Sequence, residues 1–574
     1  MKKILGLFIL FSIVLSSCKK NILEIDPQDR VSEDAVWNDE NLIKAYHNSL
    51  YNAIPHGFYI HMYSKYTDEA YNAAPCCGAD LFKLNNFTPD NILNAGRVGD
   101  FWGENSGYMY YWDYAYLNIR KMNVFIEKMQ APDAVQFPDM EKLVAETKFL
   151  RAFAYFKLLE RYGGVPIITQ AYELSDFGKL TFKKNTLDET IAFIQKDLAE
   201  ALPDLPKSYP SSNANYGRAT QDAAYALTSR LLLYAASPLF NPTNDKSKWQ
   251  KAADAAAIFT ENGDRGYSLY PDYQKLFNQP SGASQNEFIF TRNFTTTNSH
   301  QAPMHNLGRR YGAYGGWWAS NGPAQNLVDD YDMKTTGQPA FTWNGNTKSV
   351  NPASGYDPNQ PYKDRDPRFN ATVIHDSTIY HGDMWEMWVE ANGDKKGFDS
   401  WRQSSDNPRT GYILKKFMPE DGPINWQTFY TIPWPHFRLA EIYLNYAEAK
   451  FELGDEATAR TFINKVRARV GMPDIPGTVT GEALRQRLYN ERRIELAFES
   501  HRFFDIRRWK IASTIENRPI FGMDIIKNLT TGATTYNPVE LLVKNAYQEK
   551  MNLLPVETNE IRRNPDLKQT TGWD

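Results

Sequence analysis

The stretch Asn490–Trp509, NERRIELAFESHRFFDIRRW, mixes large apolar residues with charges at helical spacing. Glu491, Glu495 and Glu499 recur at every fourth position, which places their carboxylates on one face of a helix, and arginines lie within reach of that face or of another helix. Nearby guanidinium groups keep carboxylates ionised, whereas general acid–base catalysis needs two carboxylates with different pKa values. We therefore interpret the stretch as a buried, ion-paired helix and expect Glu495 and Arg507 to stabilise the fold.

Five groups of motifs follow one another along the chain: RAFAYF at 151–156 with YGGVP at 162–166, RDPRF at 365–369, RLAEIYLNYAEA at 438–449, ERRIELAFE and RFFDIRRW within 491–509, and LLP at 553–555. In this order they resemble the SusD/RagB family of nutrient-binding surface lipoproteins from Bacteroidetes-type bacteria. The resemblance covers nearly the whole mature chain.

The resemblance implies a fold and a partner. The fold class is mainly α: a tetratricopeptide-like scaffold of helical hairpins with a large loop-rich insertion that carries the ligand site. The implied partner is a TonB-dependent outer-membrane barrel of the SusC type, over which such a lipoprotein sits as a lid. The implied function is capture of a nutrient at the cell surface and its delivery to that transporter.

The composition narrows the function classes. The chain has 574 residues and a formal net charge of -4, and it lacks the concentrated basic face that nucleic-acid binding requires. Hydrophobic residues make up 42%, enough for a large core. The 34 Tyr and 14 Trp are unusual, and their flat rings with a polar edge suit ligands that have both apolar and hydroxyl surfaces.

The N-terminus has the pattern of a lipoprotein export signal. Lys2 and Lys3 precede an apolar run from 4 to 15, and small residues precede Cys18. We expect residues 1–17 to be removed, Cys18 to be lipidated, and residues 18–30 to tether the protein to the surface of the outer membrane. The alternative is a plain secretory signal with an incidental Cys18.

The remaining chain shows no long linker, so we expect a single domain over residues 31–574. Its helical scaffold is expected at about 31–55, 107–270 and 436–510, and its loop-rich regions at about 56–106 and 280–435. Helical periodicity and end signals predict individual helices at 39–54, 108–129, 140–162, 187–201, 218–236 and 247–261.

The clearest supersecondary unit is a helical hairpin over residues 437–470. Apolar residues alternate at spacings of three and four on both sides of Gly454 and Asp455. Gly454 suits a left-handed residue at the end of the first helix, and Asp455 suits the N-cap of the second.

The region 280–435 lacks steady periodicity and is rich in tryptophan. We expect some of its indoles to be exposed for contact with a ligand or a partner, since loops bury many indoles with difficulty. The tryptophans of this region are Trp317, Trp318, Trp343, Trp385, Trp388, Trp401, Trp426 and Trp434.

Catalytic, cofactor and metal signatures are missing from the sequence. There is no nucleophile elbow, zinc-protease motif, phosphate-binding loop or dinucleotide fingerprint, so we expect no enzyme activity and no cofactor. The run 392–397 fits a turn better than a calcium loop. Cys76 and Cys77 are adjacent and fit either free thiols in a loop or a vicinal disulfide, not a zinc site.

A glycan-binding site is the leading functional hypothesis. Sugars stack their CH faces on aromatic rings and exchange hydrogen bonds with neighbouring polar groups. Two Gly-punctuated stretches, 101–105 and 309–318, offer both, and the resemblance places them near the ligand face. The expected site residues are Trp102, Asn105, Arg310, Tyr311, Tyr314, Trp317 and Trp318.

Other interpretations remain open at this stage. The same aromatic residues would also suit packing of the loops or contact with the transporter. Peptide or glycopeptide capture, as in the RagB branch, is the main alternative function. A glycoside hydrolase, which needs only two suitably placed carboxylates, is the second.

Overall fold

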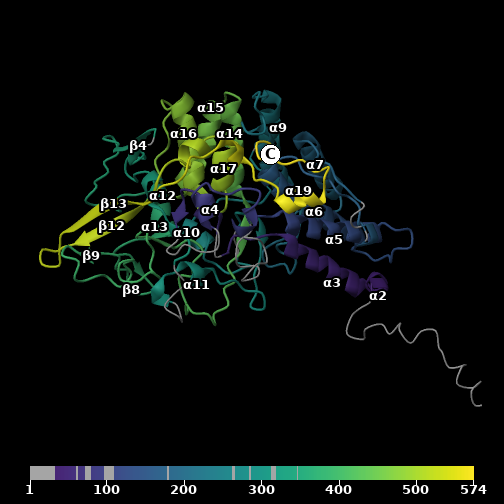
Figure 1. Cartoon of the computed structure of the whole chain (residues 1–574), viewed down its shortest axis with the longest axis horizontal. Coiled ribbons are helices and arrows are strands. Elements are labelled where there is room, and N and C mark those ends of the chain that lie inside the picture. Colours follow the sequence, from purple (N-terminus) through teal and green to yellow (C-terminus); the bar gives the residue numbers. More distant parts are fainter. Residues whose placement is uncertain are drawn as a thin grey trace, which may run out of the picture.

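The computed structural model describes residues 33–59, 62–71, 79–95, 109–172, 174–176, 180–260, 265–283, 286–311, 319–345 and 347–574. Long helices fill one side of the molecule, and short strands, short helices and loops fill the other (Figure 1). The helical side has the larger hydrophobic core, and the loop-rich side has a second core of its own. The expected fold class, mainly α with a helical-hairpin scaffold and a loop-rich insertion, is confirmed.

The long helices of the scaffold, apart from α16, coincide with the predicted segments or begin within a few residues of them; α16 begins nine residues before the predicted segment 490–509. They are α3 (Glu40–Leu50), α5 (Trp112–Met129), α6 (Met140–Tyr162), α7 (Leu187–Ala201), α8 (Gln221–Ala236), α9 (Lys246–Ala257), α14 (Leu439–Glu452), α15 (Glu456–Arg469) and α16 (Gly481–Glu495). The shorter helices are α2 (Glu33–Trp37), α4 (Ala79–Lys83), α10 (Tyr273–Leu276), α11 (Ala302–Asn306), α12 (Gln325–Asp330), α13 (Pro367–Thr372), α17 (Arg502–Arg508), α18 (Ala512–Ile515) and α19 (Thr558–Arg563).

The strands are short except at the C-terminal end. They are β1 (Ala70–Tyr71), β2 (Phe288–Arg292), β3 (Gly322–Pro323), β4 (Phe341–Asn344), β5 (Thr347–Val350), β6 (Val373–Ile374), β7 (Ile379–Tyr380), β8 (Asp383–Met384), β9 (Val389–Glu390), β10 (Ile413–Leu414), β11 (Trp434–Arg438), β12 (Ile520–Lys527) and β13 (Thr534–Leu542).

Local chemistry accounts for where the scaffold helices begin and end. Thr186 caps α7 by accepting a hydrogen bond from the Glu189 amide, and the Glu189 carboxylate reaches back to the Thr186 amide. Gly163 ends α6 with φ of +72°, a conformation that glycine adopts without steric cost. The helix therefore ends at residue 162, where the sequence predicted its end.

The predicted helical hairpin is formed by α14 and α15. Gly454, with φ of +89°, lies between them, and the Asp455 carboxylate accepts a hydrogen bond from the Thr458 amide at 3.1 Å. Phe437 is not part of the first helix, because it lies in β11, which pairs with β2. The apolar pattern therefore began in a strand that leads into the helix.

The expectation of one continuous helix over 490–509 is wrong. α16 ends at Glu495 and α17 begins at Arg502. Between them Phe498 and Ser500 have φ values of +62° and +70°, which a helix does not contain. The break turns Glu499 and Arg502 toward different partners, so that their charges are neutralised by separate parts of the chain.

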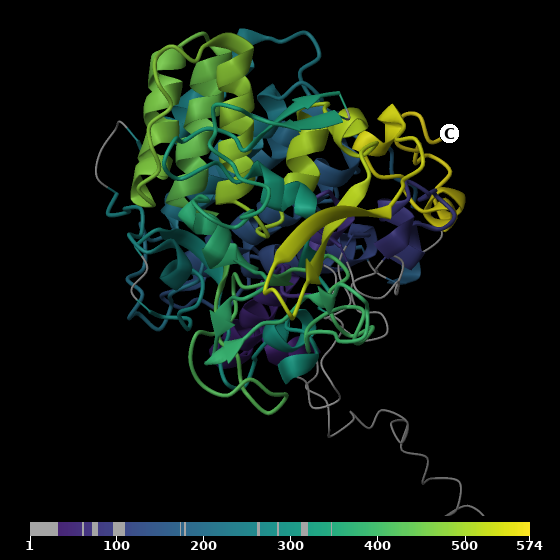
Figure 2. The same ribbon diagram turned by 90° about the vertical axis from the view of Figure 1, so that its left-hand side faces the viewer.

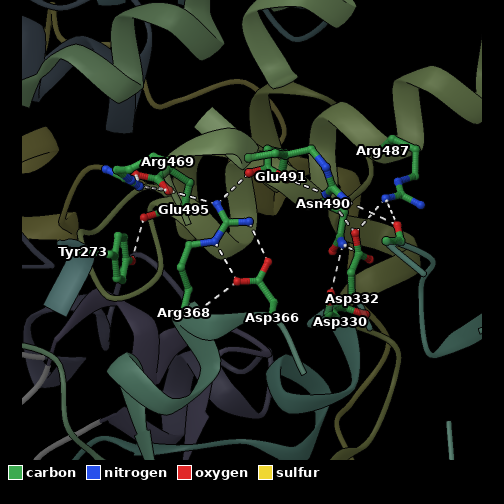
Figure 3. Close-up of polar contacts among 12 residues, drawn as sticks. Tyr273, Asp330, Asp332, Asp366, Arg368, Arg469, Arg487, Asn490, Glu491 and Glu495 are labelled. Atoms are coloured by element: carbon green, nitrogen blue, oxygen red, sulfur yellow. Dashed lines mark hydrogen bonds and ion pairs between the residues drawn. The ribbon is translucent and has the colours of Figure 1, made fainter. Parts of the chain in front are cut away.

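Glu495, at the end of α16, is the centre of a buried ion-pair network (Figure 3). It pairs with Arg368 at 2.9 Å, with Arg438 at 2.6 Å and with Arg469. Glu491 pairs with Arg368 at 2.6 Å and with Arg467 at 3.0 Å. We call these residues the α16 network: Arg368, Arg438, Arg467, Arg469, Glu491 and Glu495.

The α16 network keeps its central carboxylate ionised. Burial alone would raise the pKa of Glu495, but the charges of Arg469, Arg438 and Arg368 outweigh burial and hold that pKa far below its usual range. The structural interpretation of Glu495 is confirmed. Arg507 forms a separate buried ion pair, with Glu516 at 3.8 Å, and its guanidinium group also lies 3.5 Å from the centre of the Phe503 ring and donates to the Phe503 carbonyl.

The C-terminal ribbon of β12 and β13 was not predicted. The two strands pair antiparallel along their length, β9 joins β12 in parallel, and the ribbon projects from the body of the molecule (Figures 1 and 2).

The tryptophans of region 280–435 are less exposed than expected. Among those described, Trp385 and Trp434 are buried, and the half-buried ones are Trp343, Trp388, Trp401 and Trp426.

Several expectations concern residues outside the described ones. Cys18 and the N-terminal segment, the Cys76–Cys77 pair, and Trp317 and Trp318 belong to this group. Across the described ranges, no helix combines the length and apolar character needed to cross a bilayer.

Candidate functional site

Arg310 lies on a one-turn 3-10 helix, Arg309–Tyr311, that follows α11 on the loop-rich side of the molecule (Figure 1). Its guanidinium group forms two hydrogen bonds with the Asp399 carboxylate, at 3.1 and 2.6 Å. It also donates to the Met384 carbonyl at 3.2 Å and lies over the Phe398 ring. A bidentate pair of this kind fixes both position and orientation, so Arg310 ties the turn to the loop that carries Asp399, and its bond to Met384 adds the β7–β8 hairpin.

Tyr311 contacts the same hairpin. Its hydroxyl lies 3.3 Å from both the Tyr380 carbonyl and the Asp383 carboxylate, and its ring meets Trp385 at 6.0 Å. Burial and the Asp383 charge raise the pKa of Tyr311 to about 12. The phenol therefore stays protonated at neutral pH. The half-buried ring is held by the contacts of its hydroxyl and by its contact with Trp385.

Exposed apolar groups surround this pair. Ile379 and Met384 lie opposite each other in the hairpin and are exposed, as is Phe398, whose ring lies under the guanidinium groups of both Arg309 and Arg310. We call the group the Arg310 ledge: Arg310, Tyr311, Ile379, Asp383, Met384, Phe398 and Asp399.

The ledge combines the two kinds of surface that a sugar needs. Phe398 and Tyr311 supply ring surface for CH groups, and the half-exposed Asp383 carboxylate has further lone pairs for hydroxyl donors. Arg310 is already paired with Asp399, so its main effect is to hold the ledge in shape.

The carboxylates of the α16 region offer no comparable site. Glu491, Glu495 and Glu499 are buried and each is paired with arginine or lysine. A glycosidase needs two accessible carboxylates on either side of a bond, which these three do not provide. Within the described ranges, no group of three or more His, Cys, Asp or Glu residues is placed to hold a metal ion.

Two family models match the chain. The model described as "SusD family" matches residues 286–573, half of the chain, and the model described as "Starch-binding associating with outer membrane" matches residues 23–233. The chain belongs to the SusD family.

Solved structures and curated relatives agree with this assignment. A SusD-like protein from Bacteroides fragilis is 28% identical, with a TM-score of 0.73, over 95% of this SusD-family chain and all of that one. A SusD-like carbohydrate binding protein from the same species is 26% identical, also with a TM-score of 0.73, over 93% and 100%. SusD-like protein P25 of Formosa agariphila is 22% identical over 99% of this chain and 97% of its own.

Of the expected site residues of this SusD-family protein, the structure brings together Arg310 and Tyr311, both on the ledge. Trp102, Asn105, Tyr314, Trp317 and Trp318 lie outside the described residues, so the proposed aromatic platform stays a prediction.

Sequence reasoning missed the partners of these two residues. Asp383, Phe398 and Asp399 come from a hairpin and loop 72 to 89 positions away along the chain, and no local pattern points to them. One signal was readable: His381-Gly382 followed by Asp383 is a turn sequence, and both residues have positive φ.

Proposed function

We propose that this protein captures oligosaccharides or polysaccharides at the cell surface and delivers them to a SusC-type TonB-dependent outer-membrane transporter. The observation that carries the proposal is family membership, with one matching model described as starch-binding and outer-membrane associated. The similar Bacteroides fragilis structure is named a carbohydrate binding protein. The ledge supports the proposal because it offers ring surface beside polar groups that can still form hydrogen bonds with a ligand.

We place the binding surface on the loop-rich side. The proposed contacts are the ledge residue Tyr311, with Arg310 as its support, together with Trp102, Asn105, Tyr314, Trp317 and Trp318. Truncating an aromatic ring at the centre of such a site costs about 2 kcal/mol or more, about thirtyfold in affinity.

The direct test is a calorimetric glycan and peptide screen of the mature chain, followed by single Ala variants of the five aromatic residues. Phe182→Ala, which removes a half-buried ring on the helical side, is the matched control. Loss of binding in the loop-side variants but not in the control supports the proposal. Normal binding in all five, or binding of peptides alone, contradicts it.

We further propose that the bound glycan is not cleaved. The proposal rests on the pairing of the α16-region carboxylates with arginine or lysine, described above. Incubating the wild-type protein with its glycan and assaying reducing ends tests this directly. Release of reducing ends would show a hydrolase instead.

Anchoring at the membrane is a separate proposal that rests on Cys18. A Cys18→Ala protein, expressed in a strain that lacks the transporter, should leave the outer-membrane fraction. Retention of that variant with the membrane would contradict lipid anchoring.

The transporter partner is tested by co-purification of the barrel with the wild-type protein. If the barrel does not co-purify after mild detergent extraction, this result counts against the transporter assignment.

A further inference from the structure

A ligand-sized pocket lies on the helical side, between α5, residues from 166–172, 174–176 and 180–182 in the chain after α6, and the C-terminal α19. Its volume is about 780 Å³, within the range of about 300 to 1,000 Å³ that small-molecule pockets occupy. α5 and α19 are far apart in sequence but adjacent in the structure (Figure 1). We call it the α5–α19 pocket, and it shares no residue with the Arg310 ledge.

Two aromatic pairs line the pocket. Trp112 and Tyr116 lie one turn apart on α5, with ring centres 5.1 Å apart. Tyr172 and Phe182 come from the segment after α6, with ring centres 5.4 Å apart. Aliphatic side chains complete the apolar lining: Ile119, Ile168, Leu180 and Leu567.

The polar groups near these rings are already engaged within the protein. The Tyr116 hydroxyl donates to the Pro166 carbonyl at 2.8 Å, and Arg120 donates to the Tyr172 carbonyl at 3.0 Å. The Asn564 amide both donates to and accepts from the Phe182 backbone, at 2.9 and 3.0 Å. A sugar would bring hydroxyls that find few free partners beside these rings, and a buried hydroxyl without a partner weakens binding. The part of the pocket that the rings line therefore suits apolar surface better than sugar hydroxyls.

The charges of the lining select against anions. The lining contains three carboxylates, Asp113, Asp176 and Glu560, against two guanidinium groups, Arg120 and Arg563. Glu560 is paired with Arg563 at 2.9 Å, and burial together with the Asp113 charge raises the pKa of Glu560. A negative group on a ligand would add to this repulsion.

We propose that the α5–α19 pocket is a second ligand site, for an uncharged, mainly apolar molecule that contains an aromatic ring. The four rings and the aliphatic side chains supply the contact surface. This inference goes beyond glycan capture, which needs no such pocket.

Two fluorescent probes with one ring system test the proposal. Phenylnaphthylamine is uncharged, and anilinonaphthalenesulfonate adds a sulfonate to the same skeleton. We expect saturable binding of phenylnaphthylamine to the mature chain with a stoichiometry of one, and binding of the sulfonate at least about fivefold weaker. Phe182→Ala and Tyr172→Ala should each weaken phenylnaphthylamine binding about tenfold, since each removes one wall ring. Glu560→Gln should narrow the gap between the two probes.

Matched variants localise the binding. Tyr116→Phe keeps the ring and should bind phenylnaphthylamine normally, and Tyr311→Ala changes only the ledge and should also bind normally. Thermal melting confirms that each variant is folded. The proposal is overturned if wild-type protein shows no saturable binding, if Tyr311→Ala weakens it as much as Phe182→Ala, or if a glycan that the protein binds displaces the probe.

Discussion

The α16 network and the Arg310 ledge both bring arginine to carboxylate, but they differ in how much of each charge remains available. In the network, Glu495 meets three arginines and all the side chains are at most 2% exposed. On the ledge, the side chain of Arg310 is 17% exposed and that of Asp383 is 47% exposed. Charges that are fully paired and buried stabilise a fold. The charges of the ledge are only partly paired, so they can still form hydrogen bonds with a ligand.

The largest expected effect comes from removing the centre of the network. Glu495→Gln leaves Arg368, Arg438 and Arg469 buried without their shared counter-charge, which costs about 3 to 5 kcal/mol of unfolding free energy. Urea denaturation measures the loss. A variant that unfolds like the wild type but no longer binds ligand would assign Glu495 a functional role instead, and would remove the contrast between the two regions.

Acid should weaken the fold through buried histidines at a higher pH than that at which it reaches the network; His300 and His305 are the examples on the loop-rich side. Burial lowers the pKa of His300 to about 3 and that of His305 to about 4. Because both values lie below the unfolded value of 6.5, the unfolded chain takes up protons first, and stability falls as the pH drops below about 6.5. Each histidine should cost about 2 kcal/mol between about pH 7 and about pH 5.

The carboxylates of Glu495, in the network, and of Glu499, beside it, respond at lower pH with the same sign. The pKa values of Glu495 and Glu499 are depressed in the fold by their arginine neighbours, against the effect of burial. Their contribution is complete above the unfolded value of 4.5 and is lost below it. Urea denaturation at a series of pH values checks both ranges. A constant unfolding free energy from about pH 7 to about pH 5 would contradict the histidine contribution.

A smaller effect is expected from Arg310→Lys on the ledge. Lysine keeps the charge but cannot form the paired hydrogen bonds to Asp399, so we expect a loss of about 1 kcal/mol and a several-fold weaker glycan affinity. Calorimetry and thermal melting separate the two losses. Unchanged affinity would show that the turn carrying Tyr311 does not need this pair.

The smallest effect should come from an exposed ion pair of the scaffold. Glu200, whose side chain is 38% exposed, pairs with Lys148 at 2.8 Å and with Lys196 at 2.9 Å. Glu200→Gln should change the unfolding free energy by less than about 1 kcal/mol, because water already screens both charges. A loss as large as that of Glu495→Gln would show that burial does not decide the size of the effect.

The scaffold was predictable because its signals are local. Amphipathic spacing and end residues such as Asp455 or Gly163 lie within the segment that they shape, and the structure follows them. The break after Glu495 was not predictable in this way. The residues of 496–501 continue the helical pattern, and the turn depends on partners from distant segments, including Arg438 for Glu499 and Asp68 for Arg502.

The candidate site shows the same limit. Arg310 and Tyr311 were expected from the residue types of the stretch 309–318 and from the family resemblance. Asp399 lies 89 positions from Arg310, and no spacing rule connects the two residues.

The β12–β13 ribbon could have been predicted from the sequence. Both strands contain β-branched and aromatic residues, have suitable lengths and lie on either side of a turn with Gly532.

The distances along the chain within the α16 network also constrain the order in which the protein can fold. Arg368 is 127 positions before Glu495, and Arg438 is 57 positions before it. During synthesis both arginines emerge well before the carboxylate that they share. An early collapse around them would enclose guanidinium groups without that counter-charge, which is strongly unfavourable. Asp366 and Glu287 are earlier partners of these two arginines, but Glu495 is the carboxylate that both share. A nascent chain that stops short of residue 495 therefore cannot complete the ion pairing of its interior.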